Sequence, residues 1–290
     1  GEKARVDMDY MCELTGKTEE EIFADLKGVI FLNPMHGYGN STQAKYLMAD
    51  EYLSGNVREK LVLARKSAEL YPEDYTVNVE ALERVQPKDL TASEIAVRLG
   101  ATWLPTEIVE QFMFEFLGTP RYAQWNIKVH FSAYTGEWNI EGKSYDRSNV
   151  KAYSTYGTGR INAYKIIEET LNLKDVRIFD YVEDADGKKK AVLNKKETAI
   201  AQAKQELIKQ GFQDWVWSDP ERRERLCRLY NDKFNSLRPR EYDGSHIVFS
   251  GMNPEIELRE HQRNAVAHIL YGGNTLLAHA VGAGKSATRS

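Results

Sequence analysis

Cysteine is scarce in this chain, which has two residues of this type among 290, Cys12 and Cys227. They lie far apart and outside any cluster of cysteines and histidines. A disulfide framework needs several closely spaced cysteines, and a structural zinc site needs Cys and His ligands at characteristic spacing. The sequence therefore predicts neither, and both thiols are expected to be ordinary packing residues.

Long apolar runs and low-complexity stretches are missing as well. A membrane-spanning helix needs about 18 or more apolar residues in succession, and residues 1–5 hold no apolar core of a signal peptide. The content of 42% hydrophobic and 28% charged residues is ordinary for folded proteins, and 290 residues indicate about two domains. We therefore expect a folded, soluble and cytoplasmic protein.

The net charge of −4 hides an uneven distribution along the chain. Residues 1–85 carry ten Lys or Arg against sixteen Asp or Glu, whereas residues 221–240 carry seven against three. Basic residues on one face can neutralise DNA phosphates, which makes binding fall steeply with salt. Those predicted to do so are Arg222, Arg223, Arg225 and Arg228 on a helix and Lys188, Lys189 and Lys190 on a hairpin. A solvated helix face balanced by nearby Asp and Glu is an equally weighted alternative.

Two helices followed by a hairpin are expected at the N-terminus, where Thr18 and Glu21 have capping-box spacing. The pattern predicts helices over 7–14 and 18–27, strands over 28–34 and 46–49, and helices over 55–70 and 75–85. This order suits a small winged-helix unit. The alternative is a helical packing domain with one short hairpin.

The middle of the chain reads as hairpin, helix, hairpin, helix after a helix pair that resembles a helix-turn-helix. The pattern predicts helices over 92–99 and 106–117, a hairpin of 127–134 with 137–140, a helix over 160–171, a hairpin of 176–182 with 190–193, and helices over 196–210 and 220–234. Aromatic side chains spaced along a helix normally face the core, so Trp103, Phe112, Phe114 and Phe116 are expected inside.

A phosphate-binding motif stands near the C-terminal end. Residues 275–279 suit a buried strand, and the residues Gly282, Ala283, Gly284, Lys285 and Ser286 follow shortly after. Glycines let backbone N–H groups point at phosphates, Lys285 adds charge, and the Ser286 hydroxyl can bind Mg²⁺. The strict motif has glycine where His279 stands, so the match is partial. The chain stops soon after this motif, and we interpret it as a piece of a longer protein.

Gln262 lies upstream of this loop, in the segment Leu258-Arg259-Glu260-His261-Gln262 that opens an amphipathic helix. A glutamine amide can donate and accept hydrogen bonds at the same edge of adenine. Phe249 or Tyr271 could supply a face on which the base stacks. The combination predicts a site for ATP and Mg²⁺.

These two segments resemble the Q motif and motif I of superfamily 2 helicases, nearest to the Swi/Snf class, which also departs from glycine at the position of His279. Further segments, among them 219–223, 238–246 and 251–254, resemble the large adenine-specific DNA methylase and helicase fusion proteins of phages and conjugative elements. The resemblance implies an ATP-driven motor acting on double-stranded DNA and joined to a methylase domain and to the rest of the motor. No complete catalytic set is present, because the acidic motif II and the second motor lobe would follow Ser290. The Asn-Pro-Pro-aromatic type of motif of DNA amino-methyltransferases is also absent.

We therefore expect an α+β chain: a mostly helical accessory region with β-hairpins, followed by the start of a RecA-like α/β motor lobe. The expected domains are residues 1–87, 88–245 and 246–290. The function that follows is part of an ATP-dependent DNA helicase or translocase. The rival is a DNA-binding or scaffolding module that positions a methylase and a motor without activity of its own.

Overall fold

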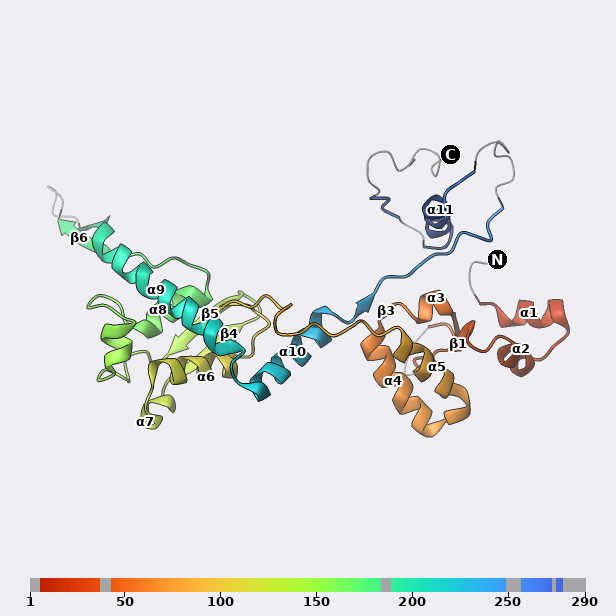
Figure 1. Cartoon of the computed structure of the whole chain (residues 1–290), viewed down its shortest axis with the longest axis horizontal. Coiled ribbons are helices and arrows are strands. Elements are labelled where there is room, and N and C mark those ends of the chain that lie inside the picture. Colours follow the sequence, from red (N-terminus) through yellow and green to blue (C-terminus); the bar gives the residue numbers. More distant parts are fainter. Residues whose placement is uncertain (1–5, 37–42, 184–188, 249–256, 273–274, 279–290) are drawn as a thin grey trace. The chain divides into compact units, whose positions relative to one another are not determined.

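The structure is a computed structural model that describes residues 6–36, 43–183, 189–248, 257–272 and 275–278 (Figure 1). By its internal contacts the chain divides into two compact units, the first of residues 1–88 and 232–290 and the second of residues 89–231. Helices dominate, and the described strands form four two-stranded antiparallel sheets. The α+β class is thereby confirmed. The three-domain division of the sequence stays a prediction.

The first unit contains the N-terminal helices and two small sheets. Its elements are α1 (Met8–Thr15), α2 (Glu19–Asp25), β1 (Ile30–Leu32), β2 (Tyr46–Met48), α3 (Ala49–Tyr52), β3 (Gly55–Asn56), α4 (Val57–Leu70), α5 (Pro72–Arg84), β8 (Leu237–Arg238) and α11 (Glu260–Gly272). Asn56 begins α4 by accepting the Glu59 N–H, and Pro72 opens α5. Phe31 and Tyr52 stack in the core between β1 and the helices, with ring centroids 5.0 Å apart.

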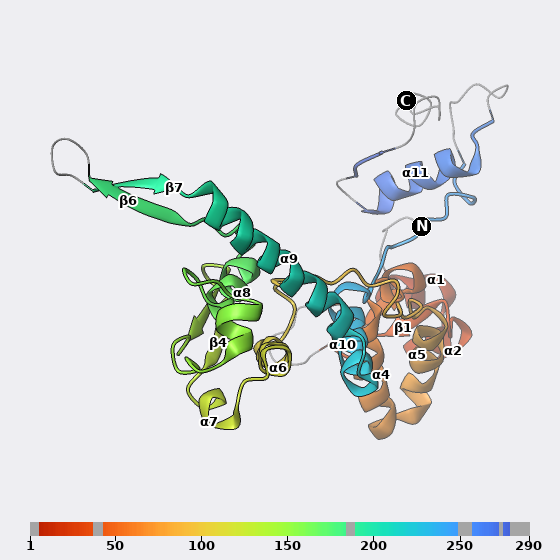
Figure 2. The same ribbon diagram turned by 60° about the vertical axis from the view of Figure 1, so that its left-hand side comes forward.

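The second unit holds the largest described core cluster. Its elements are α6 (Thr106–Leu117), α7 (Arg121–Gln124), β4 (Lys128–Ser132), β5 (Glu137–Glu141), the π-helical turn η1 (Lys151–Thr155), α8 (Ala163–Leu171), β6 (Phe179–Glu183), β7 (Lys189–Leu193), α9 (Lys195–Val216) and α10 (Pro220–Phe234). The β4–β5 hairpin turns at Gly136, whose φ of 71° is left-handed. Figure 2 shows the β6–β7 hairpin running outward from the start of α9.

The aromatic stripe of α6 faces the core, as the sequence indicates. Phe112 is fully buried, and Trp103, Phe114 and Phe116 are partly buried against the same cluster. Phe112 contacts Phe212 of α9 edge-on at a centroid distance of 5.1 Å. Phe112 therefore joins α6 to α9, and the other three rings pack against the same core.

The helix predicted over 92–99 is wrong. One turn forms at its start, where the Thr91 N–H donates to the Glu94 carboxylate at 2.8 Å, and the chain is extended beyond it. Ile95, Val97 and Leu99 are buried while the residues between them are exposed. This period of two fits extended backbone and not a helix. The helix-turn-helix proposed for this stretch is absent with it.

The buried strand expected at 275–279 is also wrong for the residues that the structure describes. Residues 275–278 belong to no strand, and Leu276 is 88% exposed. A strand of a parallel sheet depends on neighbouring strands for its hydrogen bonds. The described part of the chain provides no strand that pairs with this segment.

Candidate nucleic-acid interface

The N-terminal helix pair and hairpin fold around a small apolar cluster. α1 begins after Asp7, whose carboxylate accepts the Tyr10 N–H at 3.1 Å, and it ends at Gly16 in left-handed backbone. Thr18 and Glu21 form the capping box that the sequence predicts. The buried residues of the cluster are Met8, Ile22 and Ile30. The order helix, helix, strand, strand is therefore formed, with strands β1 and β2 paired in register.

The outer surface of α2 is acidic. Its acidic residues are Glu19, Glu20, Glu21 and Asp25. The cations nearby are paired with them, since Lys17 contacts Asp25 and the Lys45 ammonium lies 2.6 Å from the Glu19 carboxylate. A face of this charge repels DNA phosphates. Phosphate contacts are accordingly expected from other parts of the chain.

Arg222 lies inside the second unit and not on the surface where the sequence suggested it. Its side chain is 6% exposed, and its guanidinium donates to the carbonyl oxygens of Trp215 at 2.6 Å and Val216 at 3.1 Å. The guanidinium also lies over the Trp215 ring, 3.6 Å from the centroid. These contacts satisfy the carbonyls at the end of α9 and attach α10 to it, so Arg222 is not offered to a phosphate.

The other three arginines of α10 are exposed. Arg223 donates to the Trp217 carbonyl at 2.8 Å, and Arg225 pairs with Glu107 of α6 at 2.6 Å. Arg228 makes no ion pair within the described residues. An exposed ion pair contributes little free energy and exchanges readily with water, so Arg225 keeps its capacity to contact a phosphate. Arg225 and Arg228 are three residues apart and share one face of the helix.

The second hairpin carries described lysines on both of its faces. Lys189 and Lys190 are exposed on β7, opposite Glu183 and Val182 of β6, while Lys188 lies outside the described residues. Side chains of successive strand residues point to opposite faces, so Lys189 and Lys190 do not act on one surface. Each face of the β6–β7 hairpin therefore carries one of these two lysines.

Gln262 occupies the third position of α11 and is 7% exposed. Its side-chain oxygen accepts the Arg259 N–H at 2.9 Å, which is the reciprocal half of a capping box. Tyr271 lies near the other end of α11, with its hydroxyl 3.1 Å from the His246 ring. Phe249 and the residues Gly282, Ala283, Gly284, Lys285 and Ser286 lie outside the described residues, so the ATP and Mg²⁺ site stays a prediction.

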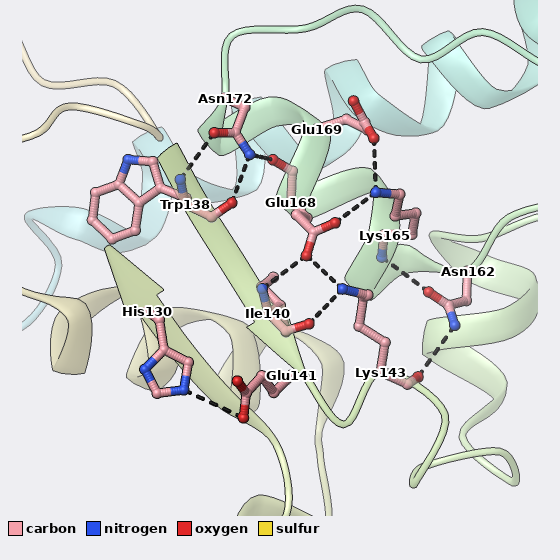
Figure 3. A network of polar contacts seen from close by, with 10 residues as sticks. All are labelled: His130, Trp138, Ile140, Glu141, Lys143, Asn162, Lys165, Glu168, Glu169 and Asn172. Atoms are coloured by element: carbon pink, nitrogen blue, oxygen red, sulfur yellow. Dashed lines mark hydrogen bonds and ion pairs between the residues drawn. The ribbon is translucent and has the colours of Figure 1, made fainter. Parts of the chain in front are cut away.

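A buried polar network that the sequence did not indicate stands beside β5 (Figure 3). Glu168 of α8 is 6% exposed and accepts the Ile140 N–H at 2.8 Å, and Lys143 and Lys165 place their ammonium groups 2.5 and 2.6 Å from its oxygens. Burial by itself raises the pKa of Glu168, but hydrogen bonds from Lys143, Lys165 and Ile140 outweigh it and hold the pKa below its ordinary value. Asn172 extends the network to Trp138. The network joins α8 to the β4–β5 hairpin and is structural.

Metal sites and membrane spans are two further features that the described residues lack. These residues contain no group of three or more His, Cys, Asp and Glu side chains that could hold a metal ion. None of their helices is long and apolar enough to cross a membrane.

Two protein families match parts of the chain. Residues 1–43 match a family described as "Probable helicase, winged helix domain", and residues 98–236 match one described as "Domain of unknown function (DUF8437)". The N-terminal segment is similar to helicase winged-helix domains. This similarity favours the winged-helix interpretation of the N-terminal segment, and it suggests a helicase-associated DNA-binding module. No curated protein and no solved structure matches the chain.

Proposed function

We propose that this chain supplies the DNA-contacting accessory region of an ATP-driven, helicase-like DNA translocase, together with the first nucleotide-binding motifs of its motor. The observation that carries the proposal is the winged-helix match over residues 1–43, which covers the helix pair and the first strand of the hairpin, β1, and ends before β2. Supporting it are the motif-I-like residues Gly282–Ser286 and Gln262 in the sequence. The methylase partner and the Swi/Snf-like class rest on sequence resemblance alone.

Local charge indicates which surfaces would contact DNA. The acidic face of α2 is unfavourable, whereas α10 exposes Arg225 and Arg228 on one face, beside Glu221 and Glu224 of the same helix. Within the proposal, Arg225 and Arg228 contact phosphates of double-stranded DNA, and the buried Arg222 positions the helix that bears them. Contacts of this kind fix position without reading sequence.

DNA binding is tested by fluorescence anisotropy of a labelled duplex at several salt concentrations. In Arg225→Gln/Arg228→Gln the slope of log K against log salt should fall by about two, one for each phosphate that the variant no longer neutralises. The matched control is Glu221→Gln/Glu224→Gln on the same helix, which removes negative charge and should tighten binding. If the wild type and both variants bound duplex with equal affinity and equal salt dependence, α10 would not be part of the DNA interface.

Nucleotide binding is tested by titrating a fluorescent ATP analogue with Mg²⁺. Lys285→Ala should abolish binding, since this lysine contributes the charge beside the phosphates, and Gln262→Ala should weaken it. Lys66→Ala, at an exposed position of α4, is the control. These titrations use a longer chain that completes the motor lobe. If that chain binds duplex but no nucleotide, the result would support the rival function, a DNA-binding scaffold that positions a methylase and a motor.

A further inference from the structure

A hollow of about 360 Å³ lies beside α9 within the second unit. We call it the α9 hollow. The residues that line it are Arg98, Leu99, Thr170, Leu173, Lys174, Asp175, Gln205, Lys209 and Gln213. Its volume falls in the range of about 300–1,000 Å³ that is usual for small-ligand sites.

One face of α9 forms a wall of the hollow. Gln205, Lys209 and Gln213 are four residues apart and therefore lie above one another on the helix. The Gln205 amide donates to the Lys174 carbonyl at 2.8 Å, and the Gln213 amide donates to the Val97 carbonyl at 2.6 Å. The two glutamines thus attach α9 to the chain on both sides of the hollow, and Lys209 is held between them.

The floor and the backbone around the hollow are fixed. Gln205 is 2% exposed, and its amide also donates to the Thr170 hydroxyl at 3.1 Å. Two residues after α8, Leu173 has left-handed backbone with a φ of 57°, and the Lys174 N–H donates to the Glu169 carbonyl at 2.9 Å. This turn places Lys174 at the rim. A site whose supporting residues are held in this way needs little reordering to bind a ligand.

The charge of the lining is positive. The lining contains three cations, Arg98, Lys174 and Lys209, and one carboxylate, Asp175. Lys209 pairs with the exposed Glu206 at 2.6 Å. Arg98 and Lys174 are exposed and make no ion pair within the part of the chain that the structure describes. Two cations at the rim of a hollow are therefore available to an anion.

We propose that the α9 hollow binds a phosphate group of a nucleic-acid backbone. Arginine can hold two phosphate oxygens at once, and lysine adds a compact positive charge. The inference goes beyond the proposed function, because it places a phosphate contact in the second unit at residues other than those of α10.

The test measures binding of the 290-residue chain to labelled duplex and to labelled single-stranded DNA by anisotropy over a range of salt. Arg98→Gln/Lys174→Gln removes two exposed charges, and Lys128→Gln/Arg147→Gln removes two exposed charges of the same unit outside the hollow. The hollow variant should bind roughly tenfold more weakly, with a salt slope smaller by about two, while the control stays within about twofold. Circular dichroism confirms that each variant is folded.

Equal losses in the hollow variant and the control would overturn the proposal, since the effect would then be net charge alone. Calorimetric titration with inorganic phosphate and with ATP separates the sources of the phosphate. Loss of their binding in the hollow variant with unchanged DNA affinity would overturn the nucleic-acid assignment. If the hollow variant binds DNA as tightly as the wild type, only the proposal for the α9 hollow is overturned. If the wild-type chain does not bind DNA at all, the proposed DNA contact is overturned as well.

Discussion

Glu168 shows how a single carboxylate can hold two elements of the second unit together. Its oxygens accept from the Ile140 N–H, Lys143 and Lys165, and these bonds keep its pKa below the ordinary value of 4.5. A carboxylate whose folded pKa is depressed contributes stability that is fully present above its unfolded pKa. That stability is lost as pH falls through the folded pKa.

Glu168→Gln should therefore lower the free energy of unfolding by roughly 1–3 kcal/mol at neutral pH. The difference between the variant and the wild type should shrink as pH falls below about 4.5. Urea unfolding at several pH values measures this. Glu169→Gln, which removes only a more exposed contact with Lys165, is the control and should have a smaller effect. A difference that grows toward acid pH would contradict the sign of the pKa shift.

Gly100 permits a close approach between two segments near the α9 hollow. Its φ is 95°, and a Cβ atom there would lie 2.5 Å from the Leu171 carbonyl oxygen at the end of α8. Both the left-handed backbone and the missing side chain are therefore required.

Gly100→Ala should lower the free energy of unfolding by about 1–3 kcal/mol, because backbone strain and a clash with a main-chain oxygen act together. Gly136→Ala isolates the strain, since Gly136 also has positive φ but a Cβ atom there would have no described neighbour within 4 Å. Its destabilisation should be the smaller of the two. Equal midpoints of urea unfolding for the two variants would show that the contact with Leu171 is unimportant.

At the scale of elements, the junction of α9 and α10 depends on a buried arginine. Arg222 caps the Trp215 and Val216 carbonyls and lies over the Trp215 ring. Arg222→Ala should lower the free energy of unfolding by about 2–3 kcal/mol, because it leaves carbonyls unsatisfied and removes packing.

Arg228→Ala on the same helix should change stability by no more than about 0.5 kcal/mol, as exposed substitutions usually do. Thermal unfolding measures both. DNA affinity should respond in the opposite order, falling for Arg228→Ala and remaining close to wild type for folded Arg222→Ala. If DNA affinity fell for Arg222→Ala but not for Arg228→Ala, Arg222 would have to be counted among the residues that contact phosphate.

Elements with strong local signals were predictable from the sequence. α6 begins and ends as the pattern indicates, and the capping box at Thr18 and the glycine turn of the β4–β5 hairpin mark their elements locally. The extended stretch ending at Leu99 was missed, although the alternation of Ile95, Val97 and Leu99 with less apolar residues is the signal that could have found it. The β3–β8 pair joins residues 55–56 to 237–238, and a two-residue pairing over that sequence distance leaves no local pattern.

At the scale of the whole molecule, the second unit has its own core, the largest of the described clusters. The polypeptide of residues 89–236, which completes α10, should therefore fold alone. We expect one cooperative transition in urea and a native-like near-ultraviolet circular dichroism spectrum. A non-cooperative transition would show that the second unit depends on the rest of the chain.

The sequence by itself determined the α+β class, the helix pair and hairpin of the N-terminus, and the order of the longer helices and hairpins from α6 to α10, though not α7 or η1, because caps, turns and periodicity act between neighbouring residues. Tertiary structure decided which charges are available. Arg222 and Arg228 look equivalent in sequence, yet only packing against α9 buries the first. The cations around the α9 hollow come from three separate segments, and folding alone brings them to one place.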